Sequence, residues 1–299
     1  MTSTDRCKLI AVVGGGVIGG GWVARCLLNG ITVNLYDPDP NARRKIDEIM
    51  INVELAFGKL IEGPAPPKGE VHFTDSIANA VVKADLIIEA VPERLDIKQS
   101  VYRDIESAAA TDTLIASSTS GILPSDLQDK MTTPGRLVVA HPFNPVYLLP
   151  LVEIVGGKKT SHLAIKNAID LFQQLGMHPL HLRKEIPAFI ADRFLEAVWR
   201  EALWLVKDGF ATTAEIDDAI RFGFGLRWAQ MGLFETYRVA GGEAGMAHFI
   251  AQFGPCLKWP WTKLTDVPEL TDELVTMIAD QSDSQSAAHS IRQLEQIRD

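Results

Sequence analysis

The sequence lacks most of the features that mark secreted, membrane-spanning or nucleic-acid-binding proteins. Only 3 of its 299 residues are cysteines, and Cys7, Cys26 and Cys256 fit neither a metal-binding spacing nor a disulfide framework. No apolar run approaches the roughly 20 residues that span a bilayer. The net charge of −9 does not favour nucleic acid or an anionic membrane as a partner. We therefore expect a protein of the reducing cytoplasm, with no metal site and no nucleic-acid or membrane partner.

The rest of the composition is that of an ordinary globular protein. Hydrophobic residues make up 46% and charged residues 22% of the chain, and its length suggests about two domains. The N-terminal residues MTSTDRCK lead directly into an apolar strand pattern, so no signal peptide is expected.

The strongest motif is a strand, a glycine-rich turn, a helix and a second strand. Lys8–Val13 is a short apolar run that predicts a buried parallel strand, and Gly14, Gly16 and Gly19 follow it with GxGxxG spacing. An apolar helix pattern then leads to a second strand at Ile31–Tyr36. Such glycines allow a tight turn, a close approach of the backbone to a pyrophosphate, and close packing of helix on strand. The pattern predicts a dinucleotide site.

Two further features of this motif indicate which dinucleotide binds. The helix beginning near Gly16 would direct the free N–H groups of its first turn, at Val17 and Ile18, toward the phosphates. Asp37 ends the second strand, where its carboxylate can accept hydrogen bonds from ribose hydroxyls. The same carboxylate would repel a 2′-phosphate, so NAD is favoured over NADP as the cofactor.

Beyond this motif, strands and helices alternate as far as residue 182. Further strands are predicted at Leu86–Val91, Thr113–Ser118, Leu137–Ala140, Leu151–Val155 and His178–Leu182. Helices are predicted at Asn41–Lys59, from a cap at Asp75 through Lys83, and at Leu95–Ala109, Leu123–Lys130 and His162–Leu175. The alternation indicates an α/β fold, a Rossmann-type, doubly wound and mostly parallel sheet over residues 1–186.

From residue 187 to residue 299 only helical patterns are found. Phe189–Asp208 has apolar residues at spacings of three and four, and Thr212-x-x-Glu215 is a capping-box signature. Helices are also expected at Gly241–Phe253 and Thr271–Ala279, and the last residues, SDSQSAAHSIRQLEQIRD, form a surface helix or a frayed tail. These patterns predict a second, all-helical domain that begins near residue 187.

Polar residues at the ends of two predicted strands are candidates for the chemistry. SSTSG contains Ser120, and His141-Pro-Phe-Asn144-Pro follows the next strand, with Glu153 beyond it. Because ligands of open α/β sheets bind at the carboxyl ends of the strands, these residues are placed for catalysis. Oxidation of an alcohol requires a base such as His141, and a carboxylate such as Glu153 would orient the ring. Ser120 could bind the reacting oxygen, while a structural role for His141 as a core histidine stays open.

The motifs GGGVIG, EAVPE, SSTSG, HPFNP, LVEIV and PAFIADRFL occur in this order along the chain. Together they resemble the 3-hydroxyacyl-CoA dehydrogenase superfamily over about residues 8–235. The resemblance implies a Rossmann domain followed by a helical domain that forms a homodimer. It also implies that His141 is the catalytic base with Glu153 as its partner, that Ser120 contacts substrate and cofactor, and that Glu93, Lys98 and Asn144 contact the cofactor.

The chain departs from the acyl-CoA members of that superfamily in two ways. Asp192 stands where those members usually have asparagine, which adds a negative charge near the expected substrate site. The segment 41–70, which corresponds to a basic CoA-binding region, carries as many acidic as basic residues: Arg43, Arg44, Lys45, Lys59 and Lys68 against Asp47, Glu48, Glu54, Glu62 and Glu70. A CoA ester is therefore disfavoured as the substrate.

The helical domain suggests a different substrate. It is rich in aromatic residues around Arg227: Trp199, Trp204, Phe222, Phe224, Trp228, Phe234 and Tyr237. Most of these side chains are expected in the core, yet aromatic faces beside a carboxylate such as Asp192 can also bind a quaternary ammonium. Arg227 could bind a carboxylate through two hydrogen bonds. L-carnitine has both groups and a hydroxyl between them.

Two later stretches, FGFGLRWAQMG and GGEAGMAHFIAQFGPCLKWPWTKLTDVPEL, resemble the bacterial L-carnitine dehydrogenase branch of the superfamily. That resemblance implies NAD-dependent oxidation of the 3-hydroxyl of L-carnitine to 3-dehydrocarnitine. The alternatives are an L-gulonate 3-dehydrogenase, a 3-hydroxybutyryl-CoA dehydrogenase, and a non-catalytic NAD-binding structural or sensor protein. The set Ser120, His141 and Glu153 argues against the last of these.

Overall fold

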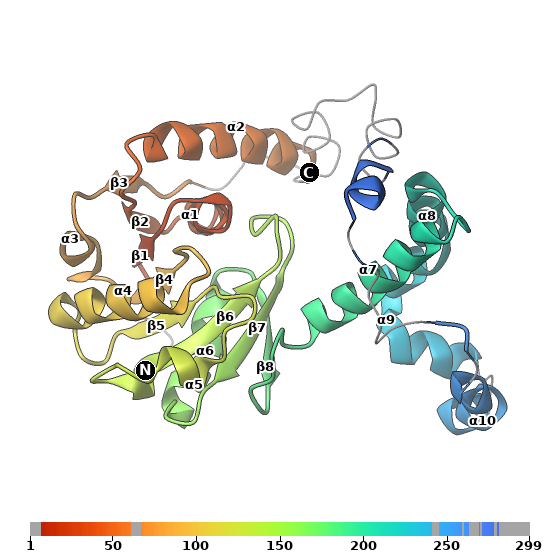
Figure 1. The fold of residues 1–299 in the computed structure, drawn as a ribbon. Helices are drawn as coiled ribbons and strands as arrows, with labels where there is room; N and C mark the ends of the chain where they lie inside the picture. The colour runs from red at the N-terminus through yellow and green to blue at the C-terminus, as the bar shows by residue number, and fades with distance from the viewer. Residues whose placement is uncertain are drawn as a thin grey trace. The chain divides into compact units, whose positions relative to one another are not determined.

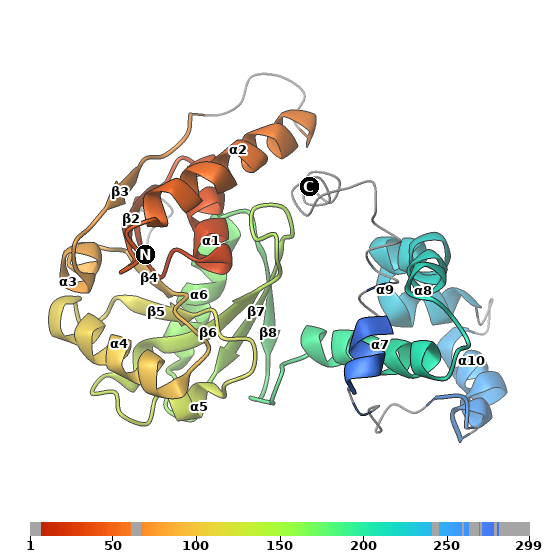
Figure 2. The same ribbon diagram turned by 45° about the horizontal axis from the view of Figure 1, so that its top comes forward.

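The computed structural model describes residues 7–60, 67–240, 245–258, 260–262, 269, 271–277 and 280. These residues form two compact units, one that ends at Asp192 and one that begins at Arg193. Figures 1 and 2 show the chain coloured from its first to its last residue. Within the described ranges, no helix is long and apolar enough to cross a membrane.

The first unit is an eight-stranded sheet in the order β3-β2-β1-β4-β5-β6-β7-β8 (Figure 1). Its strands are β1 (Leu9–Val13), β2 (Thr32–Tyr36), β3 (Val71–Phe73), β4 (Leu86–Glu89), β5 (Leu114–Ser117), β6 (Leu137–Pro142), β7 (Leu151–Gly156) and β8 (His178–Leu182). The strands from β3 to β6 are parallel, and β7 runs antiparallel to β6. This confirms the predicted doubly wound, mostly parallel sheet.

Helices cover both faces of this sheet. They are α1 (Val17–Leu28), α2 (Ala42–Leu60), α3 (Ile77–Val81), α4 (Leu95–Ala108), α5 (Pro124–Leu127) and α6 (His162–Gln174), with a 3₁₀ turn η1 (Pro134–Arg136). One core cluster joins the sheet to α1 and α6, where the rings of Trp22 and Phe172 lie 5.2 Å apart. A second cluster on the other face includes Tyr102 of α4 and Leu127 of α5. The central strands are apolar throughout because both faces are buried.

Three local features differ from the sequence-based prediction. β3 was not predicted, because three residues are too few to establish a strand pattern. The expected cap at Asp75 is wrong by one residue: Ser76 caps α3, and its hydroxyl accepts a hydrogen bond from the Asn79 N–H at 3.2 Å. The antiparallel direction of β7 follows from the short connection of residues 143–150, which leaves no room for a crossover helix.

The second unit is helical, and its described residues contain no strand. Its elements are α7 (Ala191–Lys207), whose first two residues belong to the first unit, α8 (Thr213–Ala219), the π-helical turn η2 (Ile220–Phe224), α9 (Gly225–Ala240), α10 (Gly245–Phe253) and the 3₁₀ turn η4 (Gly254–Lys258). Figure 2 shows these helices in green to blue. The capping box at Thr212 and Glu215 is present as predicted. α9 was not predicted as a helix, because Gly225 and Gly232 interrupt its pattern.

Residues 272–277 are helical, within the helix expected at Thr271–Ala279. The helix expected at Gly241–Phe253 is α10, although residues 241–244 lie outside the described residues. The expected C-terminal surface helix or tail lies outside them entirely.

Candidate active site

The glycine-rich turn between β1 and α1 leaves the start of α1 open to a ligand. Gly14 has φ of +101°, and its N–H donates to the Tyr36 carbonyl at 2.8 Å. A Cβ atom at Gly14 would lie only 2.5 Å from the Ala90 carbonyl oxygen, and one at Gly19 would overlap the carbonyl of Gly14. No atom lies within 4 Å of a Cβ built at Gly16. The turn is therefore packed closely against the sheet on one side and accessible beside Gly16.

The first turn of α1 and the end of β2 provide the groups that the sequence predicts for the cofactor. Val17 and Ile18 begin α1, whose N-cap residue, Gly16, has no side chain that could occupy the helix N-terminus. Asp37 follows β2, and its two carboxylate oxygens accept hydrogen bonds from the backbone N–H groups of Gly15 and Asp39. These bonds fix the carboxylate beside the turn, where an adenosine ribose would lie. The residues fit a bound NAD.

His141 and Glu153 are held together by strand pairing. In the antiparallel pair of β6 and β7, His141 lies directly opposite Glu153, so their side chains project from the same face. The distance from His141 Nδ1 to Glu153 Oε2 is 2.9 Å, and Glu153 is fully buried. Since an ionised carboxylate only accepts hydrogen bonds, the neutral imidazole carries its proton at Nδ1 and has its lone pair at Nε2. This is the tautomer that a general base requires.

The other oxygen of Glu153 binds the backbone at the start of α7. Its Oε1 accepts hydrogen bonds from the N–H groups of Ile190 at 2.9 Å and Ala191 at 3.0 Å. Burial alone would raise the pKa of the Glu153 carboxyl, but the hydrogen bonds from His141 and from these two N–H groups together lower it below its usual value. Glu153 is thus kept ionised beside the imidazole.

The far side of the His141 ring is bordered by one carboxylate and two aromatic rings. Asp192 Oδ2 lies 3.6 Å from His141 Nε2. The ring of Phe143 lies edge-on at 5.3 Å from the imidazole, and that of Phe189 lies at 5.5 Å. Neither phenylalanine was singled out from the sequence, although both belong to motifs that were, HPFNP and PAFIADRFL. They shield a reactive nitrogen without offering it a hydrogen-bond partner.

Ser120 lies in an exposed turn that Glu93 holds in place. Glu93 Oε1 accepts hydrogen bonds from the Ser120 N–H at 3.0 Å, the Gly121 N–H at 3.2 Å and the Thr119 hydroxyl. Burial would raise the pKa of the Glu93 carboxyl, but the Thr119 hydroxyl, the Lys98 ammonium and these N–H groups lower it. The carboxylate therefore fixes the loop that carries the predicted catalytic serine.

Lys98 belongs to a buried network that the sequence did not reveal. Its Nζ lies 2.7 Å from Glu89 Oε1, 3.3 Å from the Val91 carbonyl and 3.4 Å from Glu93 Oε2. Glu89 Oε2 accepts hydrogen bonds from the hydroxyls of Tyr102 and Ser117, each at 2.6 Å. Burial, followed by the charge of Glu89, raises the pKa of Tyr102 well above its usual value. Because all three protons of the ammonium face protein oxygens, the geometry favours a positioning role for Lys98.

The signal for Glu89 was present in the sequence. It is the one charged residue in the apolar strand Leu86–Glu89, and it is the first residue of the EAVPE motif. A buried carboxylate needs a cation or several donors, and Lys98 follows on the next helix. Periodicity indicates that such a residue is buried but does not show which partner it meets.

The remaining predicted residues are Asn144 and Arg227. Asn144 is exposed in the turn after β6, beside His141 in sequence. Arg227 lies on α9 in the second unit. In that unit the ring of Phe224 lies 4.6 Å from that of Trp228, and the ring of Tyr237 stacks on that of Phe249 at 4.6 Å. The predicted catalytic and cofactor residues thus all belong to the first unit, whereas Arg227 belongs to the second. Among the described residues, no group of three or more His, Cys, Asp or Glu could hold a metal ion.

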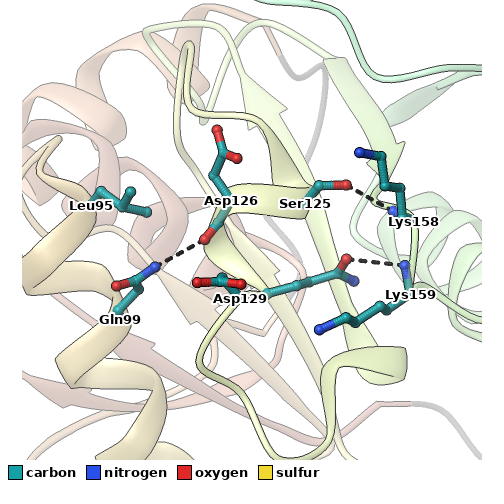
Figure 3. A pocket seen from close by; sticks show the side chains of 8 residues that line it. Leu95, Gln99, Ser125, Asp126, Asp129, Lys158 and Lys159 are labelled. Carbon is teal, nitrogen blue, oxygen red and sulfur yellow. Dashed lines mark hydrogen bonds between the residues drawn. The ribbon is translucent and has the colours of Figure 1, made fainter.

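A pocket of about 340 Å³ lies beside α4 and α5 (Figure 3). Its lining includes Asp126, Asp129, Lys158 and Lys159, and none of the predicted site residues. Figure 3 shows that hydrogen bonds between side chains and backbone connect its walls, including one from the Lys158 N–H to the Ser125 hydroxyl. Two carboxylates and two ammonium groups give this pocket no preference for ligand charge, so we assign the chemistry to the His141 region.

Both parts of the chain match one family of enzymes. Residues 9–186 match the 3-hydroxyacyl-CoA dehydrogenase NAD binding domain, and residues 189–270 match the 3-hydroxyacyl-CoA dehydrogenase C-terminal domain. The chain belongs to the 3-hydroxyacyl-CoA dehydrogenase family. Its first unit is the NAD-binding domain of that family, which agrees with the predicted cofactor, NAD.

Curated relatives and solved structures agree with this assignment. An L-carnitine dehydrogenase/betainyl-CoA thioesterase of Ruegeria pomeroyi is 62% identical over 97% of this chain, which spans 59% of that relative's length. L-carnitine dehydrogenases of Mesorhizobium japonicum and Pseudomonas putida are 60% and 53% identical over 97% and 100% of this chain, which covers 80% and 93% of those proteins. A solved 5-formyl-3-hydroxy-2-methylpyridine 4-carboxylic acid 5-dehydrogenase, an NAD⁺-dependent dismutase, is 30% identical with a TM-score of 0.77; the match covers 96% of this chain and 89% of that one.

Proposed function

We propose that this chain catalyses the NAD-dependent oxidation of the 3-hydroxyl of L-carnitine to 3-dehydrocarnitine. The observation that carries the proposal is the His141–Glu153 pair, in which a buried carboxylate 2.9 Å from Nδ1 leaves Nε2 able to accept a proton. Relatives named L-carnitine dehydrogenase, up to 62% identical, support the choice of substrate. The whole protein's activity is inferred, since the chain spans only part of its two-activity relatives.

The residues of the first unit divide the chemistry among them. His141 takes the hydroxyl proton at Nε2, and Glu153 stabilises the imidazolium that forms. Ser120 donates a hydrogen bond to the reacting oxygen. When bound, NAD⁺ accepts the hydride that leaves the carbinol carbon. The pyrophosphate of that cofactor would lie against the backbone at Gly16, in the turn that Gly14 shapes.

Further residues orient the cofactor. The first turn of α1, with Val17, Ile18 and Gly19, would direct its N–H groups toward the phosphates of the cofactor. Asp37 would bind the adenosine ribose. Glu93, Asn144 and the Ser120 loop would border the nicotinamide. Lys98 contributes by holding Glu93, whose Oε2 lies 3.4 Å away.

The two ends of the substrate are assigned by charge. Asp192 faces the trimethylammonium group, because a quaternary ammonium needs a carboxylate or aromatic faces rather than a hydrogen-bond acceptor. Arg227 binds the carboxylate through its guanidinium. We also propose that the protein is a cytoplasmic homodimer. Large apolar side chains on the described helices of the second unit support the dimer: Phe194, Leu195, Trp199, Leu226 and Phe234 are all exposed.

The test is NADH formation at 340 nm with NAD⁺ and L-carnitine, D-carnitine, L-gulonate or 3-hydroxybutyryl-CoA in parallel. We expect turnover of L-carnitine alone. Turnover of the CoA ester alone would contradict the substrate assignment and the charge argument for residues 41–70. Turnover of gulonate alone would keep the catalytic pair and remove the cation site, and no turnover of any hydroxy acid would support a sensor. Light scattering of the same preparation tests the dimer.

A further inference from the structure

The carboxylate of Asp192 lies beside the ring nitrogen of His141 that points away from Glu153, with 3.6 Å between Oδ2 and Nε2. We propose that Asp192 receives from His141 the proton released by each oxidation and passes it to solvent. This inference rests on the proposed function, because it concerns the fate of the proton that the alcohol loses. It gives Asp192 a role in proton transfer in addition to one in substrate charge recognition.

The burial of the three side chains explains why an exit for the proton is needed. The His141 side chain is 7% exposed and that of Glu153 is 0% exposed, whereas that of Asp192 is 23% exposed. A base must lose its proton before the next turnover. Glu153 cannot carry the proton outward, because its oxygens bind His141 and the backbone N–H groups of Ile190 and Ala191.

Asp192 is a partly exposed polar group placed to carry that proton to solvent. Phe143 and Phe189, whose rings pack near the imidazole, have no atom that can accept a proton. The 3.6 Å separation exceeds the 2.7–3.2 Å of a hydrogen bond, so Asp192 does not hold Nε2 permanently and leaves its lone pair for the substrate hydroxyl. The proton transfer requires that the Asp192 carboxylate approach Nε2 after the ketone forms.

The steps balance as follows. The O–H bond of the alcohol breaks and its proton binds Nε2, while the C–H electron pair leaves as hydride for the nicotinamide and the carbon–oxygen bond becomes a carbonyl. The Nε2–H bond then breaks, the proton binds Asp192 Oδ2, and the carboxylic acid releases it to water. Each turnover yields one ketone, one NADH and one proton in solution, and returns His141 to its neutral form.

The experiment compares the wild-type protein with Asp192→Asn, which keeps the shape of the side chain and cannot take up a proton in this range. Stopped-flow absorbance records NADH at 340 nm and proton release through a pH indicator in weakly buffered solution, with L-carnitine in excess. In the wild type the two signals should rise together. In Asp192→Asn, NADH of the first turnover should form while proton release lags about tenfold or more, and kcat should fall about ten- to hundredfold.

Rescue and matched controls separate proton transfer from structure. Raising imidazole buffer at constant pH and ionic strength should restore kcat of Asp192→Asn in proportion to its concentration and leave the wild type unchanged. Asp192→Glu should retain coupled signals, since it keeps an acid. Asp170→Asn, the same change at an exposed ion pair of α6, should behave as wild type. If Asp192→Asn does not fold, Asp192→Ala takes its place, and proton release should again lag behind NADH formation.

The failure of this inference can be told from failure of the proposed function. Simultaneous NADH and proton signals in Asp192→Asn, or a lowered kcat that imidazole does not restore, would overturn the proton role. A raised KM for L-carnitine with kcat unchanged would leave Asp192 as a cation-binding residue alone and would also overturn it. Absence of NADH from L-carnitine with the wild type would reject the proposed function and this inference together.

Discussion

Two buried charged clusters lie at the carboxyl ends of strands in the first unit, and they differ in how fully they are bonded. Around Glu89, both carboxylate oxygens are occupied by Lys98, the Val91 N–H, Tyr102 and Ser117 at 2.6 to 2.9 Å. Around His141, one ring nitrogen binds Glu153 at 2.9 Å, and the other lies 3.6 Å from the carboxylate of Asp192.

The difference separates a structural cluster from a reactive one. A buried polar group whose donors and acceptors all have partners within the protein is rigid and cannot hydrogen-bond a ligand. A general base must instead keep one nitrogen available to the proton that it abstracts. The Glu89 cluster therefore holds β4, β5 and α4 in place, while the His141 cluster is the one that we propose for the chemistry. Mutation of the first should change stability, and mutation of the second should change rate.

The largest expected effect is that of His141→Gln on the rate. We expect kcat to fall about 10⁴-fold, or about 5.4 kcal/mol, because the proton acceptor is lost. NAD affinity by fluorescence titration and the unfolding midpoint should change little, since the glutamine amide can still donate to Glu153. His162→Gln, at an exposed position of α6, is the matched control and should leave kcat unchanged. A loss of stability in place of a loss of rate would remove the distinction between the clusters.

Lys98→Met should have the converse effect, a loss of stability of about 3–5 kcal/mol. The substitution leaves the fully buried Glu89 without its cation, and chemical denaturation measures the change. Adding Glu89→Gln to Lys98→Met should recover part of the loss, because the uncompensated charge is removed as well. Strictly additive losses in this double-mutant cycle would contradict the buried pair. Lys166→Met, at an exposed pair, should stay within about 0.5 kcal/mol of the wild type.

Glu153→Gln should affect both properties, because Glu153 binds the base and the backbone of α7. We expect kcat to fall about a hundredfold, or about 2.7 kcal/mol, as the imidazolium loses its partner. The pKa of Glu153 is lowered in the folded state by its hydrogen bonds. A lowered folded-state pKa stabilises the fold above the unfolded value of about 4.5, and that stabilisation is lost as the pH falls through the folded value.

The gap in thermal midpoint between the wild type and Glu153→Gln should therefore narrow as the pH is lowered from 6 toward 3. Glu48→Gln, at an exposed pair of α2, should show a small gap that does not narrow in this way. A gap for Glu153→Gln that stays constant over this range would mean that the carboxylate charge does not stabilise the fold.

Local patterns in the sequence predicted the fold, but they did not predict which side chains of separate elements contact one another. β1, the glycine turn, α1 and β2 follow from spacing within one short stretch. His141 follows from its place at a strand end, and Glu153 from its place in the next strand. The Glu89–Lys98 pair and the approach of Asp192 to His141 depend on how separate elements meet, which residue spacing does not encode. For the same reason the sequence did not show that the rings of Phe143 and Phe189 lie near His141. The strand β3 was missed because it is only three residues long.

The smallest expected effect concerns the turn that brings the Ile190 N–H to Glu153. Ala188 has φ of +60°, a left-handed conformation that is strained for any residue except glycine. Ala188→Gly should relieve about 1 kcal/mol of strain and lose part of it to the greater entropy of the unfolded chain, for a net gain of about 0.5 kcal/mol. Ala202→Gly, within α7, should instead cost about 1 kcal/mol. Denaturant unfolding of both variants measures whether the free energy of unfolding rises in Ala188→Gly and falls in Ala202→Gly. If Ala188→Gly is as destabilising as Ala202→Gly, the turn is not strained, and Phe189 and Glu153 are held by their own contacts.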